Sequence, residues 1–279
     1  EITHSKYDKN TPIISLNDIK NIVNKSNFSI LNLNCRSLRN KLEDLKILLN
    51  FVDSSIIGLT ETWINNGEDH LINIPGYTFF HVGRSVGRGG GVGFLVPLPF
   101  ECSIVNYRAK VSTFEYLMLK TKYHNTSIKL CMIYRPPNYC IKTFLNELSD
   151  FLSVNAKPSK YIFLIGDFNI DLLKSSDDTN SHTFLNLLHS YNLYPTIHSP
   201  TRVTIHTSTL IDNIFTNFPT TNIISAIISY DLSDHLPMII SLNKTIRSST
   251  SKNPVRKRIV NKAQIDIFLK KLNDSDWST

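Results

Sequence analysis

Residues 161–169, YIFLIGDFN, say most about the fold of this chain. After Tyr161 the segment has no polar side chain until Asp167, which predicts a strand over 161–165 with both faces buried. Asp167 and Asn169 follow where that strand ends. Strand ends and the loops beyond them are where a sheet presents side chains to a ligand. The stretch therefore predicts a buried sheet with polar groups at its edge.

Strands outnumber helices on either side of this stretch. Apolar residues alternate or run together in several short segments, and three longer segments show helical spacing. Because several strands are adjacent in sequence, the pattern favours mixed or antiparallel sheets over a doubly wound parallel sheet. The expected strands are Phe28–Asn34, Ile56–Thr60, 94–96, Phe114–Tyr123, Ser127–Tyr134, Leu210–Thr216, Ile223–Ser229 and Pro237–Leu242, and the expected helices are Lys41–Val52, Ile141–Val154 and Thr183–His189.

The composition is that of an ordinary globular protein. The 279 residues are 41% hydrophobic and 19% charged, which is enough to build a sizeable core. No apolar run approaches the roughly 20 residues that span a membrane, and the first residues lack the apolar region of a secretory signal. The four cysteines have no zinc-ligand spacing, so we interpret them as scattered thiols of a reducing compartment. Because the chain starts without Met and stops abruptly, we expect it to be an excerpt from a longer protein.

The net charge of +7 is concentrated near the C-terminus. In residues 244–279, nine Lys and Arg residues face three acids, a net charge of +6, which leaves about +1 for the rest. The basic balance is therefore a property of this tail and does not predict a basic groove on the body. We expect an N-terminal extension over 1–25, one domain over 26–243, and a basic linker over 244–279 that contains a short helix at Ala263–Leu272.

Acids and amides recur where a predicted strand ends. Taken singly, such segments have plain interpretations, because Asp-x-Asn after a strand is usually a turn and Asp234-His235 alone could be a surface loop. Their occurrence together, each behind an apolar strand, is what suggests a site. Carboxylates gathered at one edge repel one another without a cation, and carboxylate and amide oxygens suit magnesium or manganese. The segments are Asn32-Leu33-Asn34, Leu59-Thr60-Glu61-Thr62, Gly166-Asp167-Phe168-Asn169, Leu210-Ile211-Asp212-Asn213 and Ser233-Asp234-His235.

This ordered set resembles the endonuclease/exonuclease/phosphatase superfamily, which includes pancreatic-type deoxyribonuclease and the apurinic endonucleases. Over roughly residues 28–243 the chain is similar to the endonuclease domain of non-LTR retrotransposons. The end of the tail, with Asp276-Trp277, resembles the start of a linker toward a reverse transcriptase. The segments that carry the resemblance are LNLN at 31–34, TETW at 60–63, RGGGV at 88–92, YRPP at 134–137, GDFN at 166–169, IDNIFTN at 211–217 and SDH at 233–235.

The resemblance implies a fold and a metal. The fold is a four-layer α/β sandwich of the deoxyribonuclease kind, in which two packed mixed β-sheets are flanked by helices. The metal is magnesium, with manganese as an alternative. Glu61 resembles the principal metal ligand, and Asn34 should lie close to the metal, at a position where apurinic enzymes usually have Asp.

The resemblance also implies catalytic roles. Asp167 should orient or deprotonate the attacking water, and Asn169 should hold the phosphate or the nucleophile. His235 should contact the scissile phosphate, with Asp234 orienting it and Asp212 supporting the histidine side of the site. A histidine hydrogen-bonded to a carboxylate has its tautomer fixed and its pKa raised, which suits this role.

Four further residues complete the expected site. Tyr134 resembles a phosphate-contacting phenol, and Asn32 should brace the loop after its strand. Ser233 and Thr207 are expected to support the site or to bind substrate. Ser233 belongs to the SDH segment, and Thr207-Ser208-Thr209 resembles the DNA-contacting hairpin region of the retrotransposon enzymes.

The implied function is that of a magnesium-dependent endodeoxyribonuclease. It would hydrolyse a phosphodiester of double-stranded DNA and leave a 3′-hydroxyl nick that primes target-site reverse transcription. Element RNA would be an indirect partner through the rest of the polyprotein, with no membrane involved and the nucleus as the expected location. The alternatives are another phosphoesterase of the superfamily (an apurinic endonuclease or a lipid or inositol-phosphate phosphatase) and a catalytically inactive nucleic-acid-binding derivative. All motif residues are present, which argues against the inactive derivative.

Overall fold

The computed structural model describes residues 10–23, 28–52, 55–84, 89–98, 100–109, 113–123, 126–157, 160–242, 269–271 and 274. The chain separates into two compact units, Glu1–Lys244 and Thr245–Thr279. In the second unit, residues 269–271 are helical and fall within the helix expected at Ala263–Leu272. Apart from these and Asp274, the expected basic linker lies outside the described residues.

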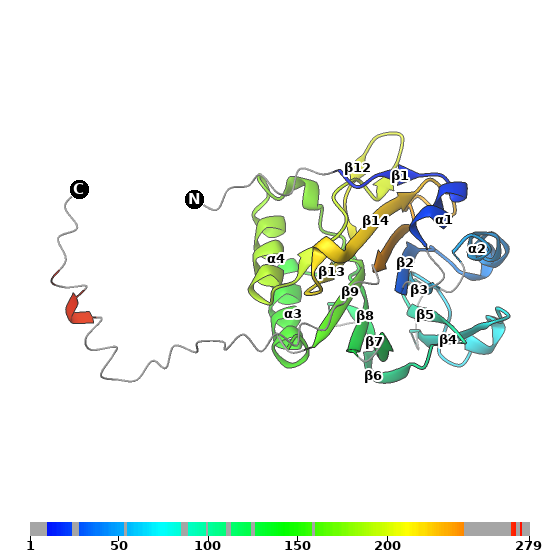
Figure 1. The fold of residues 1–279 in the computed structure, drawn as a ribbon, viewed down its shortest axis with the longest axis horizontal. Coiled ribbons are helices and arrows are strands. Elements are labelled where there is room, and N and C mark those ends of the chain that lie inside the picture. Colours follow the sequence, from blue (N-terminus) through cyan, green and yellow to red (C-terminus); the bar gives the residue numbers. More distant parts are fainter. Residues whose placement is uncertain are drawn as a thin grey trace. The chain divides into compact units, whose positions relative to one another are not determined.

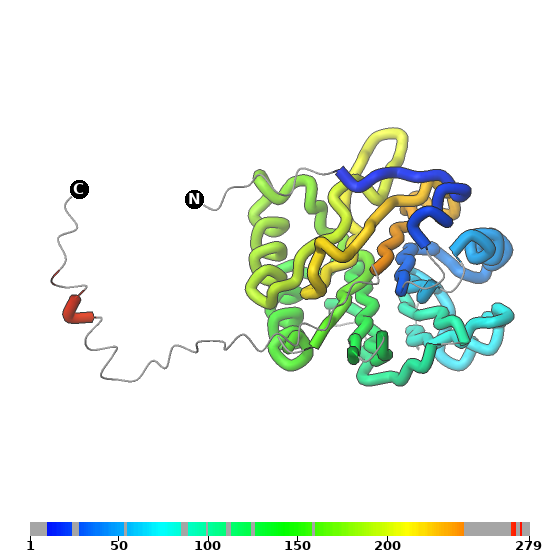
Figure 2. Tube along the Cα trace, viewed as in Figure 1, coloured from blue at the N-terminus to red at the C-terminus, as the bar shows by residue number. Residues whose placement is uncertain are grey.

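The first unit contains two mixed β-sheets that pack against each other (Figure 1). The larger sheet has the strand order β1-β14-β15-β2-β3-β5-β4, and the smaller sheet has the order β10-β13-β9-β8-β7-β6. Pairing is parallel for β1 with β14, β2 with β3 and β8 with β9, and antiparallel for the other neighbours. Figure 2 shows β2 in blue beside β15 in orange, so strands from the two ends of this unit's sequence meet inside the larger sheet.

The strands of the larger sheet are β1 (Ile13–Ile14), β2 (Phe28–Asn34), β3 (Ile56–Thr60), β4 (Tyr77–Val82), β5 (Val92–Pro97), β14 (Ile223–Ile228) and β15 (Met238–Leu242). Those of the smaller sheet are β6 (Ser103–Arg108), β7 (Glu115–Tyr123), β8 (Thr126–Tyr134), β9 (Tyr161–Asp167), β10 (Tyr194–Pro195) and β13 (Asp212–Thr216). A separate hairpin consists of β11 (Arg202–Val203) and β12 (Ser208–Thr209). The helices are α1 (Ile19–Ile22), α2 (Leu42–Leu49), α3 (Ile141–Asn155) and α4 (Thr179–Ser190).

Strand β2 shows how alternation in sequence builds two layers. Leu31 and Leu33 share a buried cluster with Leu45 and Leu48 of α2, outside the larger sheet. Asn34 instead points toward the smaller sheet, because successive side chains of a strand face opposite ways. Burying each leucine stabilises this layer by roughly 1.5–3 kcal/mol.

Helices α3 and α4 cover the outer face of the smaller sheet, and Figure 1 shows α1 and α2 on the opposite side of the sheet pair. Phe144 of α3 and Phe184 of α4 pack in one buried cluster with Leu164 of β9. Helix α4 begins at Thr179, four residues before the expected start, because the Asp178 carboxylate caps it by accepting from the N–H of Ser181. The expected four-layer sandwich, two mixed sheets with helices on both outer faces, is confirmed.

Several elements escaped the sequence analysis. Strands β4 and β6 have mostly half-buried or exposed side chains and lack the alternation that marked the other strands. Near the N-terminus, Ile13–Ile14 pair with β14, and Ile19 is fully buried against the larger sheet. This part of the expected N-terminal extension therefore packs on the domain, and residues 1–9 lie outside the described residues.

The topology gathers the polar strand ends at one edge. Asn34 is the last residue of β2, and Tyr134 pairs with Asp167 where parallel β8 and β9 both end. The expectation that every candidate follows a strand is wrong for Asp212 and His235. Asp212 begins β13, and His235 precedes β15; an antiparallel strand starts at the edge where its neighbour ends. Among the described residues, no helix has the length and apolar character needed to cross a membrane.

Candidate active site

Asn34 lies at the centre of the candidate site. Its Nδ2 donates hydrogen bonds of 2.9 Å to Glu61 Oε1 and to Asp167 Oδ2. Its Oδ1 accepts from the backbone N–H of Arg36 at 3.2 Å. Turning the amide over would set its oxygen against two carboxylates and its NH₂ against an N–H, so this orientation is the chemically favoured one. Asn34 thus joins the two carboxylates as a donor, and the oxygen that a metal ligand would use faces Arg36.

Glu61 stands on a tight turn that follows β3. The φ angles of Glu61 and Trp63 are +51° and +55°, a region that residues other than glycine rarely adopt. The half-buried carboxylate of Glu61 accepts from Trp63 Nε1 at 3.3 Å and from the hydroxyl of Tyr134. Burial raises the pKa of Tyr134, and the charges of Glu61 and Asp167 raise it further. Tyr134 therefore keeps its proton and acts as a donor to Glu61.

Asp212 and His235 form a buried pair. His235 Nδ1 and Asp212 Oδ2 are 2.9 Å apart, and Thr201 Oγ1 donates to the same carboxylate oxygen at 2.8 Å. Burial lowers the pKa of His235, but the charge and hydrogen bond of Asp212, together with the charges of Asp167 and Asp234, outweigh it and raise this pKa to about 9. The imidazole is therefore protonated at neutral pH and can donate to an anion.

Asp167 lies beside this pair. Metal-ligating atoms of Asp167, Asp212 and His235 all lie within 4.8 Å of one another. Burial raises the pKa of Asp167 well above its usual range, and the charge of Asp212 raises it further, against the lowering effect of His235. Asp212 Oδ1 is buried without a hydrogen-bond partner. Two buried carboxylates this close favour a shared proton or a bound cation.

Asn169 shapes the loop behind Asp167. Its backbone N–H donates to Asp167 Oδ1 at 2.9 Å, and its own φ is +49°. Its Nδ2 donates to the carbonyl oxygen of Arg135 at 2.8 Å, while the Arg135 guanidinium donates to the carbonyl oxygens of Asn169 and Tyr139 at 3.3 and 2.7 Å. Asn169 is therefore next to Asp167, and its amide nitrogen is already engaged by the backbone.

Asp234 does not have the partner expected for it. Its Oδ1 accepts from Arg36 Nη1 at 2.7 Å and its Oδ2 accepts from Arg202 Nε at 2.8 Å. The histidine is oriented by Asp212 instead. The backbone of His235 forms an isolated β-bridge with that of Arg202. Because successive side chains of extended backbone point in opposite directions, the side chains of Asp234 and His235 face different neighbours. Burial raises the pKa of Asp234, but the hydrogen bonds from Arg202 and Arg36 lower it to about 2.

The remaining predicted residues have different surroundings. Ser233 Oγ donates to the carbonyl oxygen of Asn34 at 2.6 Å and accepts from His235 N at 3.1 Å, which ties the two loops together. Asn32 was expected to brace a loop, but neither amide atom of its buried side chain has a hydrogen-bond partner. It lies within β2, where its register partners on the neighbouring strands are Gly58 and Met238. Thr207 lies in the turn of the β11–β12 hairpin, where its hydroxyl pairs with that of Thr204 at 2.9 Å.

The donor set suits a hard divalent cation. Glu61 and Asp167 converge on one amide, and Asp167 and Asp212 bring carboxylate oxygens into one small volume. The nearest thiol, Cys35, donates to the carbonyl oxygen of Thr60 at 3.2 Å, and burial raises its pKa to about 12. Because the thiol stays protonated, the site presents carboxylate oxygens rather than thiolate, as magnesium or manganese prefers.

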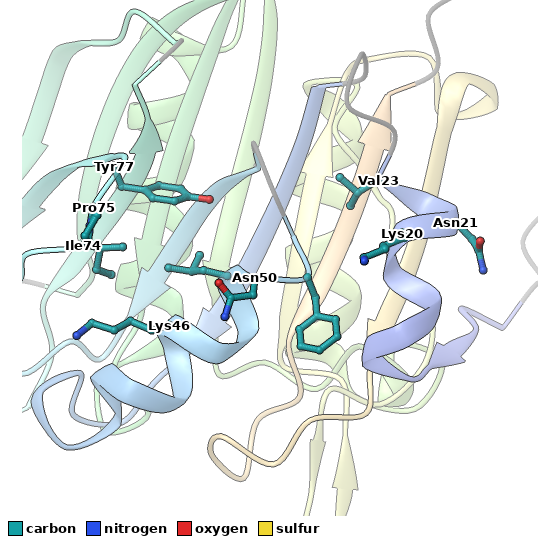
Figure 3. A pocket seen from close by; sticks show the side chains of 10 residues that line it. Lys20, Asn21, Val23, Lys46, Asn50, Ile74, Pro75 and Tyr77 are labelled. Carbon is teal, nitrogen blue, oxygen red and sulfur yellow. The ribbon is translucent and has the colours of Figure 1, made fainter.

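A hollow of about 960 Å³ lies elsewhere, between α1, α2 and the segment 74–77 (Figure 3). Lys20 and Lys46 contribute to its wall, and its described lining contains no carboxylate. None of its lining residues belongs to the candidate set. This hollow therefore lacks the carboxylates expected of the site, and the chemistry of the side chains identifies the strand edge as the candidate site.

Sequence reasoning missed the residues that hold the candidates in place. Asp212 accepts a hydrogen bond from Thr201, and Glu61 accepts one from Trp63. Asp234 accepts from Arg36 and Arg202. Arg36 lies just after the LNLN segment and Trp63 ends the TETW segment, but nothing in local spacing distinguishes a residue that anchors a carboxylate from one that faces solvent.

Two comparisons of sequence bear on the family. The sequence profile of the endonuclease/exonuclease/phosphatase family matches residues 31–235. That range contains every candidate residue of the site. No curated protein sequence matches the chain.

Solved structures share the fold. The endonuclease domain of TRAS1, a telomere-specific non-LTR retrotransposon, aligns with a TM-score of 0.62 at 15% identity over 78% of this chain and 98% of that one. The AP endonuclease LMAP from Leishmania major aligns with a TM-score of 0.65 at 12% identity, over 83% and 92%. The catalytic domain of Xenopus laevis APE2 aligns with a TM-score of 0.62 at 14% identity, over 78% and 94%. At these identities the likeness concerns the arrangement of sheets and helices.

Proposed function

Because the chain belongs to the endonuclease/exonuclease/phosphatase family, we propose that it is a magnesium-dependent endonuclease that nicks double-stranded DNA. We further propose that it forms the endonuclease portion of a non-LTR retrotransposon polyprotein. In that setting the nick would leave a 3′-hydroxyl for target-site reverse transcription. The proposed domain spans residues 26–243, with Ile13–Ile14 and Ile19 packed on it, and the tail over 244–279 would lead toward the reverse transcriptase.

The observation that supports this most directly is the chain of contacts across the strand edge. Asn34 joins Glu61 to Asp167, and Asp167 lies beside the Asp212–His235 pair. The site therefore has carboxylates on one side and a protonated imidazole on the other. A phosphodiester has its anionic oxygens and its leaving oxygen on different sides of phosphorus, so it can meet both kinds of group at once.

Glu61 would hold the magnesium ion beside Asn34, and the ion when bound supplies Lewis-acid stabilisation of charge on the phosphate oxygens. Tyr134 and Trp63 keep the Glu61 carboxylate oriented by donating to it. Asn34 holds the two carboxylates near each other, which makes up for their mutual repulsion before a cation arrives.

His235 and Asp212 would act on the phosphate. Asp212 fixes Nδ1 as the inward-facing nitrogen, which leaves Nε2–H to donate to a nonbridging oxygen of the scissile phosphate. The positive charge of the imidazolium then offsets the negative charge that grows on phosphorus oxygens as water attacks. Thr201 stabilises the arrangement by donating to the same carboxylate.

Asp167 would orient the attacking water and take its proton. A carboxyl with a raised pKa is a stronger base once ionised, which favours proton transfer near neutral pH. The new bond joins the water oxygen to phosphorus, and the bond to the 3′ oxygen breaks, with that oxygen taking up a proton from solvent water. The products are a 3′-hydroxyl and a 5′-phosphate.

Surface features around the site support DNA as the substrate. Arg36 and Arg202 have side chains that are 46% and 35% exposed and converge on Asp234 next to His235, where they can meet backbone phosphates. The β11–β12 hairpin beside them carries Ile205, which is 93% exposed and is available for contact with a groove. Element RNA would be reached through the rest of the polyprotein, and the nucleus is the proposed location.

A plasmid assay tests the proposal. Supercoiled DNA incubated with the chain and magnesium should become nicked circles, and EDTA should abolish the conversion. A polymerase should extend the nicks without prior phosphatase treatment, because the ends are 3′-hydroxyls. Release of phosphate from a phosphoinositide without nicking, or cleavage confined to abasic DNA, would move the chain to another activity of the family. Binding of DNA without cleavage would identify an inactive derivative.

A further inference from the structure

Glu115 and Arg84 form an ion pair that the proposed chemistry does not use. Glu115 begins β7 and is 1% exposed, and Arg84 Nε donates to its Oε1. The Glu115 carboxylate loses its hydration on burial, so the pair contributes little stability compared with apolar side chains of the same size. Its presence therefore calls for a role in geometry.

The other oxygen of Glu115 holds a glycine loop, which we define as Gly89–Gly91. Glu115 Oε2 accepts from the N–H of Gly91 at 2.6 Å. Gly90 has a φ of +69°, and a Cβ there would lie 2.4 Å from Arg84 Nε and 2.5 Å from Glu115 Oε1. The loop is therefore closed around the ion pair, with no room for a side chain at Gly90.

The glycine loop in turn holds the Glu61 turn, which we define as Glu61–Trp63. Thr62 N donates to Gly91 O at 3.3 Å, and Trp63 N donates to Gly90 O at 3.0 Å. Glu61 and Trp63 both have positive φ, a conformation that persists only when its surroundings impose it. The contacts with the glycine loop are part of what imposes it, alongside those from Ser37 and Leu38.

Trp63 completes the connection. Its Nε1 donates to Glu61 Oε2 at 3.3 Å. A Cβ on Gly89 would lie 3.8 Å from both Trp63 Nε1 and Arg84 Nη1, so the indole and the guanidinium flank the same residue. The ion pair is thus linked through one loop to both the backbone and the side-chain orientation of Glu61.

We propose that Glu115 and Arg84 are positioning residues for Glu61, and that they set the affinity of the site for its divalent cation through the glycine loop. The inference rests on the proposed metal-dependent function. It assigns a purpose to the RGGGV segment, of which Gly89–Val92 are described here. Loss of such a supporting contact behind a metal ligand typically weakens metal affinity by roughly tenfold to a hundredfold.

Trp63 offers a direct readout. The chain has two tryptophans, and Trp277 lies outside the described residues. In a Trp277→Phe background, quenching of Trp63 emission by manganese measures cation binding without any cleavage. Because the indole donates to Glu61, its emission also reports the state of the carboxylate.

The test compares Glu115→Gln with Glu147→Gln in that background. Glu147→Gln is the matched control, because it removes a carboxylate that pairs with Arg108 at 2.6 Å, away from the Glu61 turn. We expect Glu115→Gln to raise the manganese dissociation constant by roughly tenfold or more. Activity at saturating metal should fall by only a few fold, and Glu147→Gln should match the parent in both.

Three outcomes would overturn the inference. One is a lower melting temperature of Glu115→Gln with an unchanged manganese dissociation constant, which would mean a purely structural role. Another is an equal weakening by Glu147→Gln. If Glu115→Gln does not fold, Arg84→Met takes its place, since Arg84 is partly exposed; unchanged manganese binding in that variant would also overturn it.

A parent that nicks DNA and binds manganese while Glu115→Gln matches it would refute this inference alone, whereas a parent that does neither would refute the proposed function too.

Discussion

The two sides of the site are connected to Asp167 in different ways. Glu61 is connected through hydrogen bonds of Asn34, whereas His235 is bonded to Asp212, which pairs with Asp167 in the sheet. Glu61 is half-buried on a turn with two positive φ angles, held by backbone contacts from the glycine loop. Asp212 and His235 are 2% and 4% exposed and are joined by a direct hydrogen bond. Asp212 lies in β13, whose ladder with β9 also fixes Asp167. One side of the site is therefore oriented by a loop and the other by a sheet.

This difference suggests a division of labour. A carboxylate on a loop can adjust as a cation and its water ligands arrive, and its surroundings should govern metal affinity. A histidine buried against a strand keeps a fixed tautomer, and its surroundings should govern the pH dependence of activity. Substitutions on the two sides should therefore fail in recognisably different ways.

The largest effect is expected for Glu61→Ala. Loss of the principal cation ligand should lower the nicking rate by roughly a thousandfold, about 4 kcal/mol of transition-state stabilisation. The fold should persist, because the carboxylate is half-buried and belongs to no apolar cluster. Single-turnover nicking rates across a magnesium series, with circular dichroism as the check on folding, measure both. Full activity of this variant in EDTA would contradict the assignment of Glu61.

Asp212→Asn should have the next largest effect, and its signature should be a change in pH dependence. The parent needs a protonated His235, so its activity should fall at the alkaline end as pH rises through the raised pKa of about 9. Without the charge and hydrogen bond of Asp212, the pKa of His235 should fall, because burial is then opposed only by the charges of Asp167 and Asp234. The rate at pH 8 should then drop by roughly a hundredfold, as expected for a misplaced acid.

The measurement is a rate profile from pH 5.5 to pH 9.5 at saturating magnesium. Glu61→Ala is the contrast, since its profile should be low at every pH without a shift of the alkaline limb. An alkaline limb that stays in place for Asp212→Asn would show that His235 is not the group that titrates.

These expectations show which parts of the site the sequence could supply. Asn34, Tyr134 and Asp167 were predictable because each ends a strand whose apolar pattern is strong, and pairing then brings the ends together. The partner of His235 was misassigned because Asp234 is its neighbour in sequence, while Asp212 lies 23 residues away and is joined only by folding. The same holds for the contact between Arg36 and Asp234, which are 198 residues apart. Local patterns predict elements, and contacts this distant depend on how the sheets pack.

Thr201→Val should have a smaller effect on the same side as Asp212. Thr201 is fully buried, and the substitution keeps its shape while removing the 2.8 Å hydrogen bond to Asp212 Oδ2. A hydrogen bond to a charged group contributes about 1.5–3 kcal/mol, so the free energy of unfolding should fall by about that amount. Activity should fall by roughly tenfold, with the alkaline limb moved slightly. Urea unfolding together with the rate profile measures both, and an unchanged unfolding free energy would show that the bond contributes nothing.

Asp234→Asn should have the smallest effect, and it separates the two possible partners of His235 most sharply. Asp234 pairs with Arg36 and Arg202, whose side chains are 46% and 35% exposed, and exposed ion pairs contribute less than about 1 kcal/mol each. An asparagine can still accept a hydrogen bond from either arginine. The rate at pH 8 should therefore stay within about threefold of the parent, and the alkaline limb should stay near pH 9, because Asp212 remains bonded to Nδ1. DNA affinity should change little, since both arginines keep their charge. A loss of rate as large as that of Asp212→Asn, with the same shift of the alkaline limb, would mean that Asp234 orients His235. In that case Asp212 in β13 would not be the residue that fixes this side of the site.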